Sequence, residues 1–209
     1  MEIKSNIEYG DLKKLIKEMS KTYSVKVGLL AGKGGEESVT ENLDMAALGL
    51  VHEFGADINH PGGTPYFINE YGMATFVKKD SFYGQLLIKR GQVTKPHNIN
   101  IPARPWLSMP LTRNGGKDLK NKIDKNIKKI SGTNKGEFTD YLIKSGDFGS
   151  LAVILGVSAV EQIQEAFDTE GFGEWQPNAP ATIAQKHSEM PLIDKGNLRK
   201  RVTYEVTNG

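Results

Sequence analysis

The chain has 209 residues, with 27 Lys and Arg against 25 Asp and Glu, and a formal net charge of +2. This balance gives no general electrostatic attraction to nucleic acid or to an anionic membrane. The absence of cysteine excludes disulfides, thiolate nucleophiles and cysteine-ligated metals. The first residues lack the apolar core of a signal peptide and no apolar run reaches membrane-spanning length, so we expect no membrane partner. A hydrophobic fraction of 38% with 23 glycines predicts a small core with long loops or arms that order against a partner.

The N-terminal quarter predicts a helix, a strand and a second helix. Apolar residues recur at helical spacing over 12–23, and alternate with other residues over 25–29, which is typical of a half-buried strand. A second helix over 42–54 ends at Gly55, which fits the left-handed cap position. Two functional sequence motifs are incomplete in this region. The glycines at 28 and 32 enclose one residue too few for a phosphate loop, and Ala56 stands where a zinc-protease motif starting at His52 needs its second histidine. We therefore interpret His52 as a helix-end histidine.

Residues 58–104 predict a protruding β-hairpin arm. Dense turn residues over 60–65 precede three β-like runs, at 66–68, 74–77 and 85–89. His60 and His97 flank the arm and are expected to meet at its base. No further metal ligand accompanies them, so we expect no metal and no cofactor. The arm then leads into Ile99–Leu107, where two prolines bracket Arg104; we interpret this stretch as a rigid corner between a sheet half and a helical half.

The remaining chain predicts helices and a last strand. Residues 117–130 carry an apolar stripe opposite a lysine face, 138–144 form a short helix, and 148–167 form the longest helix and the backbone of the core. Ala152, Gly156 and Ser158 on that helix would let another element approach closely. The tail, 171–209, ends in an alternating strand over 202–206. That strand pairs either with 25–29 or with the edge of a neighbouring subunit's sheet.

These elements predict an α+β fold, in which a small antiparallel sheet packs with helices. We expect one domain over 1–209, with 58–104 as an inserted hairpin arm and 171–209 as an extended C-terminal arm that ends in a strand.

Two separated patches carry a family resemblance. The run from Gly173 to Pro177, then Thr182–Lys186 and Pro191–Leu198, resembles the phage virion morphogenesis (tail-completion) proteins, although Asn178 and Lys195 depart from the usual Leu and Thr. The run Val51–Gly55, followed by Ile101–Leu107, looks like the related neck and tail-completion proteins, as do residues 60–66 between them. Together the patches cover roughly a third of the chain in a consistent order. They mark structural corners and contain no reaction chemistry.

The resemblance implies a non-enzymatic structural protein of a tailed-phage virion, assembled in the host cytoplasm. Such proteins form rings, commonly hexameric, at the neck or the tail end, where they complete the tail and enable head–tail joining with other neck and tail proteins. Aromatic residues and arginine often anchor interfaces, with core packing as the equal alternative for each tryptophan. The subunit-interface candidates are Arg104, Trp106, Trp175, Leu192, Leu198 and Tyr204.

Two other classes of function stay open. A ring that lines a DNA channel, or binds nucleic acid without sequence specificity, would use the lysine face of 117–130. Its candidate DNA-facing residues are Lys117, Lys120, Lys125 and Lys128. An enzyme is the less favoured class, because its only nucleus would be Glu53, Asp57, His60 and His97, and nothing in the sequence fixes their geometry.

Overall fold

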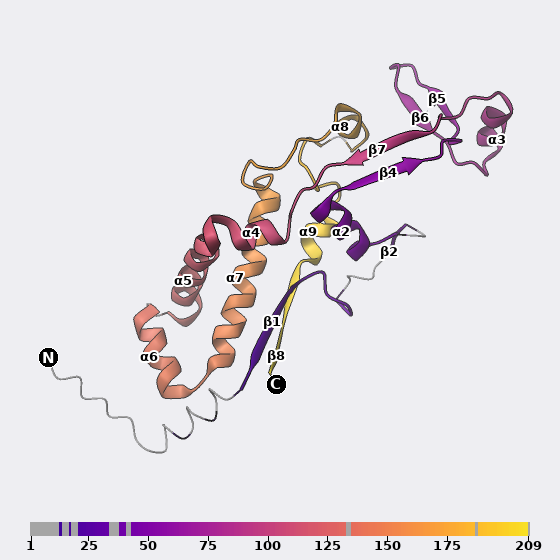
Figure 1. Cartoon of the computed structure of the whole chain (residues 1–209). Helices are drawn as coiled ribbons and strands as arrows, with labels where there is room; N and C mark the ends of the chain where they lie inside the picture. Colours follow the sequence, from indigo (N-terminus) through magenta and orange to yellow (C-terminus); the bar gives the residue numbers. More distant parts are fainter. Residues whose placement is uncertain are drawn as a thin grey trace. The chain divides into compact units, whose positions relative to one another are not determined.

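The structure is a computed structural model that describes residues 13, 17, 21–33, 38–40, 43–132, 135–186 and 188–208 (Figure 1). Helices accompany small antiparallel sheets of two strands each, which is an α+β fold. The chain divides into two compact units. We call Met1–Phe54 with Ala103–Gly209 the larger unit, and Gly55–Pro102 the smaller unit. The chain returns to the larger unit between Pro102 and Ala103, within the stretch Ile99–Leu107 that we interpret as a rigid corner. The helix expected over 12–23 lies almost wholly outside the described residues, and its last member, Tyr23, begins a strand instead.

The larger unit is built around α7 (Phe148–Asp168), the longest described helix, as the sequence predicts. Its N-cap is Asp147, whose side chain accepts a hydrogen bond from the Ser150 amide. Strands β1 (Tyr23–Gly28) and β8 (Thr203–Asn208) pair antiparallel, with Val25 opposite Val206. Both strands pack against α7 (Figure 1). The last strand therefore pairs within its own chain.

Small residues on α7 allow the close approaches that the sequence predicts. A Cβ atom placed on Gly156 would lie 2.2 Å from Cδ2 of Tyr204, so only glycine admits the β8 ring at this point. On α5 (Lys117–Ser131), the Asn126 amide donates to the hydroxyl of Ser158, at 3.0 Å. That hydroxyl in turn donates to the carbonyl of Ile154. Helix α7 is thus in contact with the sheet and with α5.

A second apolar cluster joins α5, α6 (Lys135–Ser145) and α7. It contains Ile127, Phe138, Leu142 and Ile154, all buried. Helix α6 ends at Gly146, whose φ of 67° is the left-handed conformation that glycine adopts readily. The helices predicted over 117–130 and 138–144 are both confirmed. They are preceded by the short α4 (Ser108–Thr112) and a 3₁₀ turn, η1 (Arg113–Gly116).

The C-terminal segment belongs to the main core. After α7 the chain forms α8 (Pro180–Lys186) and α9 (Asn197–Arg201) before β8. Trp175, Leu198 and Val202 are buried in the main cluster together with Trp106 and Phe167. The expected C-terminal arm is thus corrected: it ends in a strand, but apolar burial makes it part of the packed unit rather than an extended arm. The unit is completed by β2 (Ser38–Thr40), β3 (Leu43–Asp44) and α2 (Met45–Phe54).

The smaller unit is an antiparallel ribbon with a hairpin and a helix. Strands β4 (Ala56–His60) and β7 (His97–Ile101) pair in register, and β5 (Tyr66–Ile68) pairs with β6 (Ala74–Phe76). The hairpin runs at 66–68 and 74–77 are confirmed. The strand predicted at 85–89 is wrong, because α3 (Phe82–Lys89) occupies this region. Ser81 caps α3 by accepting from the Gly84 amide, and one helical face buries Gly84 and Leu87.

Candidate functional site

Parts of the two sequence patches that carry the resemblance lie together in the larger unit. The end of α2, the corner at 103–107 and the loop at 175–178 lie in direct contact through hydrogen bonds and ring packing. We call this region the junction. Its residues come from positions more than fifty apart in the sequence, so only the fold brings them together.

Glu53, at the end of α2, holds the start of α4. Only 6% of Glu53 is exposed. One carboxylate oxygen, Oε2, accepts from the Leu107 amide at 2.8 Å, and Oε1 accepts from the amide and the hydroxyl of Ser108. These amides begin a helix, where backbone donors lack partners inside the helix and negative charge is favoured. The carboxylate is fully engaged as a cap, which leaves no free oxygen for catalysis of proton transfer.

Arg104 joins the corner to the 175–178 loop. It is 5% exposed, and burial lowers the pKa of its guanidinium below the usual arginine value. Nε donates to the carbonyl of Gln176 at 2.8 Å, and Nη2 donates to the carbonyl of Pro177 at 3.1 Å. The Arg104 amide also donates to the carbonyl of His52. Arg104 therefore binds the loop through its side chain and α2 through its backbone amide. The desolvation cost of the guanidinium is offset by charge-assisted hydrogen bonds to the two loop carbonyls.

Three aromatic rings fill the apolar side of the junction. The indole N–H of Trp106 donates to the carbonyl of Gly49 at 2.8 Å. The rings of Trp106 and Phe167 lie 6.0 Å apart, and those of Phe167 and Trp175 lie 5.6 Å apart in a T-shaped arrangement. Such pairs add stability beyond the area that they bury. Gly49 admits Trp106 because a Cβ there would lie only 3.1 Å from the indole.

The junction also gathers basic groups. His52 has a buried Nδ1 without a hydrogen-bond partner, and burial, then Arg104 and then Lys186 lower the pKa of its imidazole. Lys186 donates to the carbonyl of Met190, and burial is the main reason that its pKa lies below the usual lysine value. The neighbouring cations thus favour a neutral His52. His52 lies in the last turn of α2, as its interpretation as a helix-end histidine predicts.

The predicted interface candidates lie mostly inside the larger unit. Arg104, Trp106, Trp175 and Leu198 are buried within the chain, which agrees with the core-packing alternative and leaves them little surface for a partner. Leu192 is half-buried against the main core, and Tyr204 is half-buried against Gly156. The sequence identified structurally central residues, because aromatic residues and arginine are common both at interfaces and in polar-bonded cores.

The candidate DNA-facing lysines, in contrast, are on the surface. Lys117, Lys120, Lys125 and Lys128 are all exposed on α5. Two other lysines of that helix are engaged with α7: Lys122 pairs with Glu165, and Lys129 with Glu161. The lysine face is therefore diluted by acidic neighbours from the adjacent helix.

The residues of the possible enzyme nucleus have other partners. Asp57 accepts from the Asn100 side chain. His60 and His97 meet as predicted, with stacked rings 5.0 Å apart. His60 Nδ1 accepts from the Gly62 amide, while His97 Nδ1 bonds the Lys95 carbonyl and so carries its proton there. Within the described part of the chain, no group of three or more His, Cys, Asp or Glu is arranged to hold a metal ion.

The smaller unit exposes many large apolar side chains. Of its residues, only Gly62, Pro65, Gly84 and Leu87 are buried. One face of the ribbon pairs Ile58 with Ile99, beside the two histidines, while the other face is entirely polar. Two-stranded ribbons of this kind are marginal in water unless the apolar face is covered. The large apolar side chains exposed in this unit are Ile58, Ile68, Tyr71, Met73, Phe76, Phe82, Tyr83, Ile88 and Ile99.

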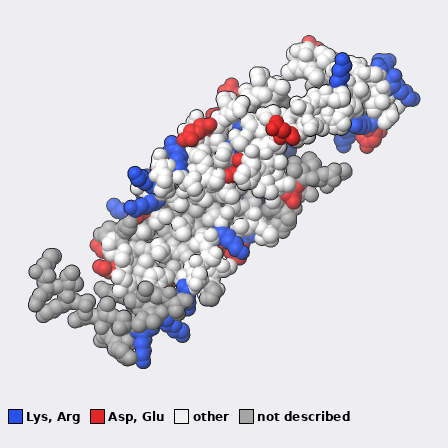
Figure 2. All heavy atoms as spheres, in the orientation of Figure 1, with Lys and Arg blue, Asp and Glu red and all other residues white. Residues whose placement is uncertain are grey.

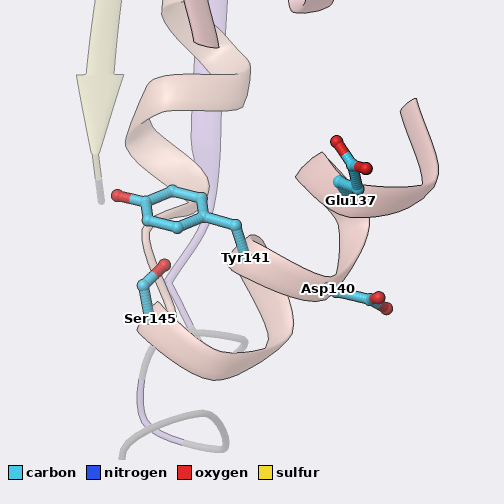
Figure 3. Close-up of a pocket in the computed structure, with 4 residues that line it drawn as sticks. All are labelled: Glu137, Asp140, Tyr141 and Ser145. Carbon is cyan, nitrogen blue, oxygen red and sulfur yellow. The ribbon is translucent and has the colours of Figure 1, made fainter. Parts of the chain in front are cut away.

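A shallow depression lies on α6 of the larger unit. Its volume is about 500 Å³, and Glu137, Asp140, Tyr141 and Ser145 line it. Figure 3 shows Tyr141 and Ser145 on one side of the helix, with the two carboxylates further along it. The Tyr141 hydroxyl donates to Asp147, the N-cap of α7. The residues offer acidic and aromatic contacts but no nucleophile with an adjacent base.

Comparisons with known proteins give no family. No protein-family model matches the chain, and neither the curated proteins nor the solved structures include one that is similar to it. No helix among the described residues is both long and apolar enough to cross a bilayer.

Proposed function

We propose that this protein is a non-enzymatic structural protein of a tailed-phage virion. In this proposal it forms a homo-oligomeric ring, hexameric in the expected case, at the neck or the tail end. The ring completes the tail and enables head–tail joining, in contact with other neck and tail proteins. The chain assembles into the virion from the host cytoplasm.

The junction is the observation that carries this proposal. The patches that resemble the tail-completion and neck proteins are separate in sequence, yet Arg104 bonds one patch to the other at Gln176 and Pro177. Glu53, Trp106 and Trp175 complete the same buried region. Parts of both patches thus contribute to one buried region, which supports the proposal.

The surface of the smaller unit supports assembly. Exposed apolar patches on soluble proteins commonly mark contacts with other proteins. Here nine large apolar side chains are exposed in a unit of a few dozen residues. A protein that functions as a subunit in a larger particle would cover such a surface.

Removal of the gene from the phage that encodes this chain tests the proposal. Electron microscopy of the lysate should show filled heads and separate tails that fail to join, with few complete particles. The wild-type chain supplied from a plasmid should restore joined particles, which controls for effects on neighbouring genes. Normal yields of intact virions without the chain would overturn the proposal.

The exposed lysines of α5 favour a second candidate, a ring that lines a DNA channel. Contacts with phosphates make binding fall steeply with salt. In this case the purified chain should bind duplex DNA without sequence preference, and Lys120→Glu with Lys125→Glu should weaken binding and reduce its salt dependence. Equal anisotropy of a labelled duplex with both proteins, at low and at moderate salt, would remove this candidate and leave the first one standing.

A further inference from the structure

The end of the smaller unit around α3 combines cations with exposed aromatic rings. Lys78 and Lys79 precede the helix, and Lys89 and Arg90 end it. All four are exposed, and none forms an ion pair with a carboxylate of the described residues. Figure 2 shows basic side chains at this end of the unit, with fewer acidic side chains among them; exposed Asp80 is next to Lys79 in the sequence. We call these four residues, with Phe76 and Phe82, the basic tip.

The two phenylalanines make the basic tip an unusual surface for a free monomer. Phe82 is 89% exposed and Phe76 is 62% exposed. Burying an aromatic side chain removes a large apolar surface from water, so leaving two of them exposed forgoes a substantial stabilisation. The neighbouring cations determine which kind of surface can cover the rings. They repel a basic surface and attract an acidic one.

The α6 depression has the complementary chemistry. Two of its four lining residues, Glu137 and Asp140, are acidic, and Tyr141 supplies an exposed ring. The depression on the larger unit is thus acidic with an exposed aromatic ring, and it matches the basic tip with its exposed rings on the smaller unit.

We propose that the basic tip of one copy docks onto the α6 depression of the next copy. Phe82 enters the depression beside Tyr141, while the tip cations face Glu137 and Asp140. The tip and the depression are different patches, so the contact is heterologous and repeats from copy to copy until a ring closes. This inference rests on the proposed function only in taking a second copy as the occupant. Aliphatic side chains around the tip, such as Ile88, favour a protein over nucleic acid, whose partners are more polar and more basic.

Charge reversal of each surface tests the pairing in the full-length chain. The tip variant carries Lys78→Glu and Lys79→Glu, the depression variant carries Glu137→Lys and Asp140→Lys, and a combined variant carries all four changes. Molar mass is measured by light scattering across a wide range of chain concentrations. Each half-reversed variant should need an about tenfold higher concentration for half-assembly, and the combined variant should recover most of that loss. Lys120→Glu with Lys125→Glu makes the same charge change elsewhere and should leave the mass unchanged.

The possible outcomes separate this inference from the proposed function. Rings that form equally well in the half-reversed variants, or that fail to recover in the combined variant, would overturn the pairing and leave the ring in place. A wild-type chain that stays monomeric at every concentration would overturn the ring as well. Circular dichroism confirms that each variant is folded, and Phe82→Ser, which changes no charge, should weaken assembly in the same way.

The experiment also detects two other binding partners of the basic tip, namely nucleic acid and an anionic membrane. Labelled duplex DNA and vesicles that contain anionic lipid are each titrated with wild-type chain and tip variant. Binding that the tip variant loses, with no change in molar mass between the two proteins, would overturn docking between copies in favour of nucleic acid or membrane.

Discussion

In the junction, single side chains form hydrogen bonds with backbone amides and carbonyls of other segments. Glu53 is the clearest case, since its charge caps the start of α4 from a different helix. We predict that Glu53→Gln lowers the free energy of unfolding by about 1–3 kcal/mol, because a neutral amide accepts less strongly and presents a donor where two donors already point. Urea unfolding measures the change. Glu174→Gln, at an exposed ion pair with Arg113, is the matched control and should have little effect; equal loss from both variants would contradict the capping role.

The pKa of His52 predicts a dependence of stability on pH. Burial and the nearby cations lower this pKa in the folded chain below the ordinary value of 6.5. The unfolded chain therefore binds the proton more readily, so this contribution to stability is present above pH 6.5 and is lost as the pH falls towards the folded-state pKa. Urea unfolding at a series of pH values should show this loss, and His52→Gln should reduce the slope. His97→Gln is the control; a slope that depends on His97 instead would contradict the assignment.

At the scale of elements, periodicity predicts what is long and amphipathic. Helix α7, helix α5 and the final strand follow from the spacing of apolar residues alone. Helix α3 does not, because a run of five mostly apolar residues suits a strand or a helix equally, and the decision falls to the Ser81 cap and to burial of Leu87. Strand β4 is also not predicted by periodicity, because Asp57, Asn59 and His60 are weak strand formers. These residues form a strand because they pair with β7. The partners of Arg104, over seventy residues away, need the whole fold.

The contact between α7 and β8 gives a prediction at this scale. A Cβ at Gly156 would overlap the Tyr204 ring, so Gly156→Ala should destabilise the larger unit by about 1–3 kcal/mol, despite the better helix propensity of alanine. Gly149, on the same helix, has only ordinary contacts around its Cβ position, at 3.6 Å or more. Gly149→Ala should therefore be neutral or stabilising. Thermal unfolding of the two variants provides the comparison, and a stabilised Gly156→Ala would mean that β8 does not lie against α7.

For the whole molecule, the two units differ in how much apolar surface they bury. The larger unit holds both apolar clusters, while Leu87 and Pro65 are the main buried apolar residues of the smaller unit. Regions with few buried contacts open at low free-energy cost, so limited proteolysis of dilute chain should cut first between Asn59 and His97. If copies dock through the basic tip, the same bonds should become protected as the chain concentration rises, whereas the tip variant with Lys78→Glu and Lys79→Glu should stay sensitive. Mass spectrometry of the first fragments locates the cuts. First cuts inside α7 would show that the core is wrongly placed, and equal protection of both proteins at high concentration would show that assembly covers the smaller unit by a different contact.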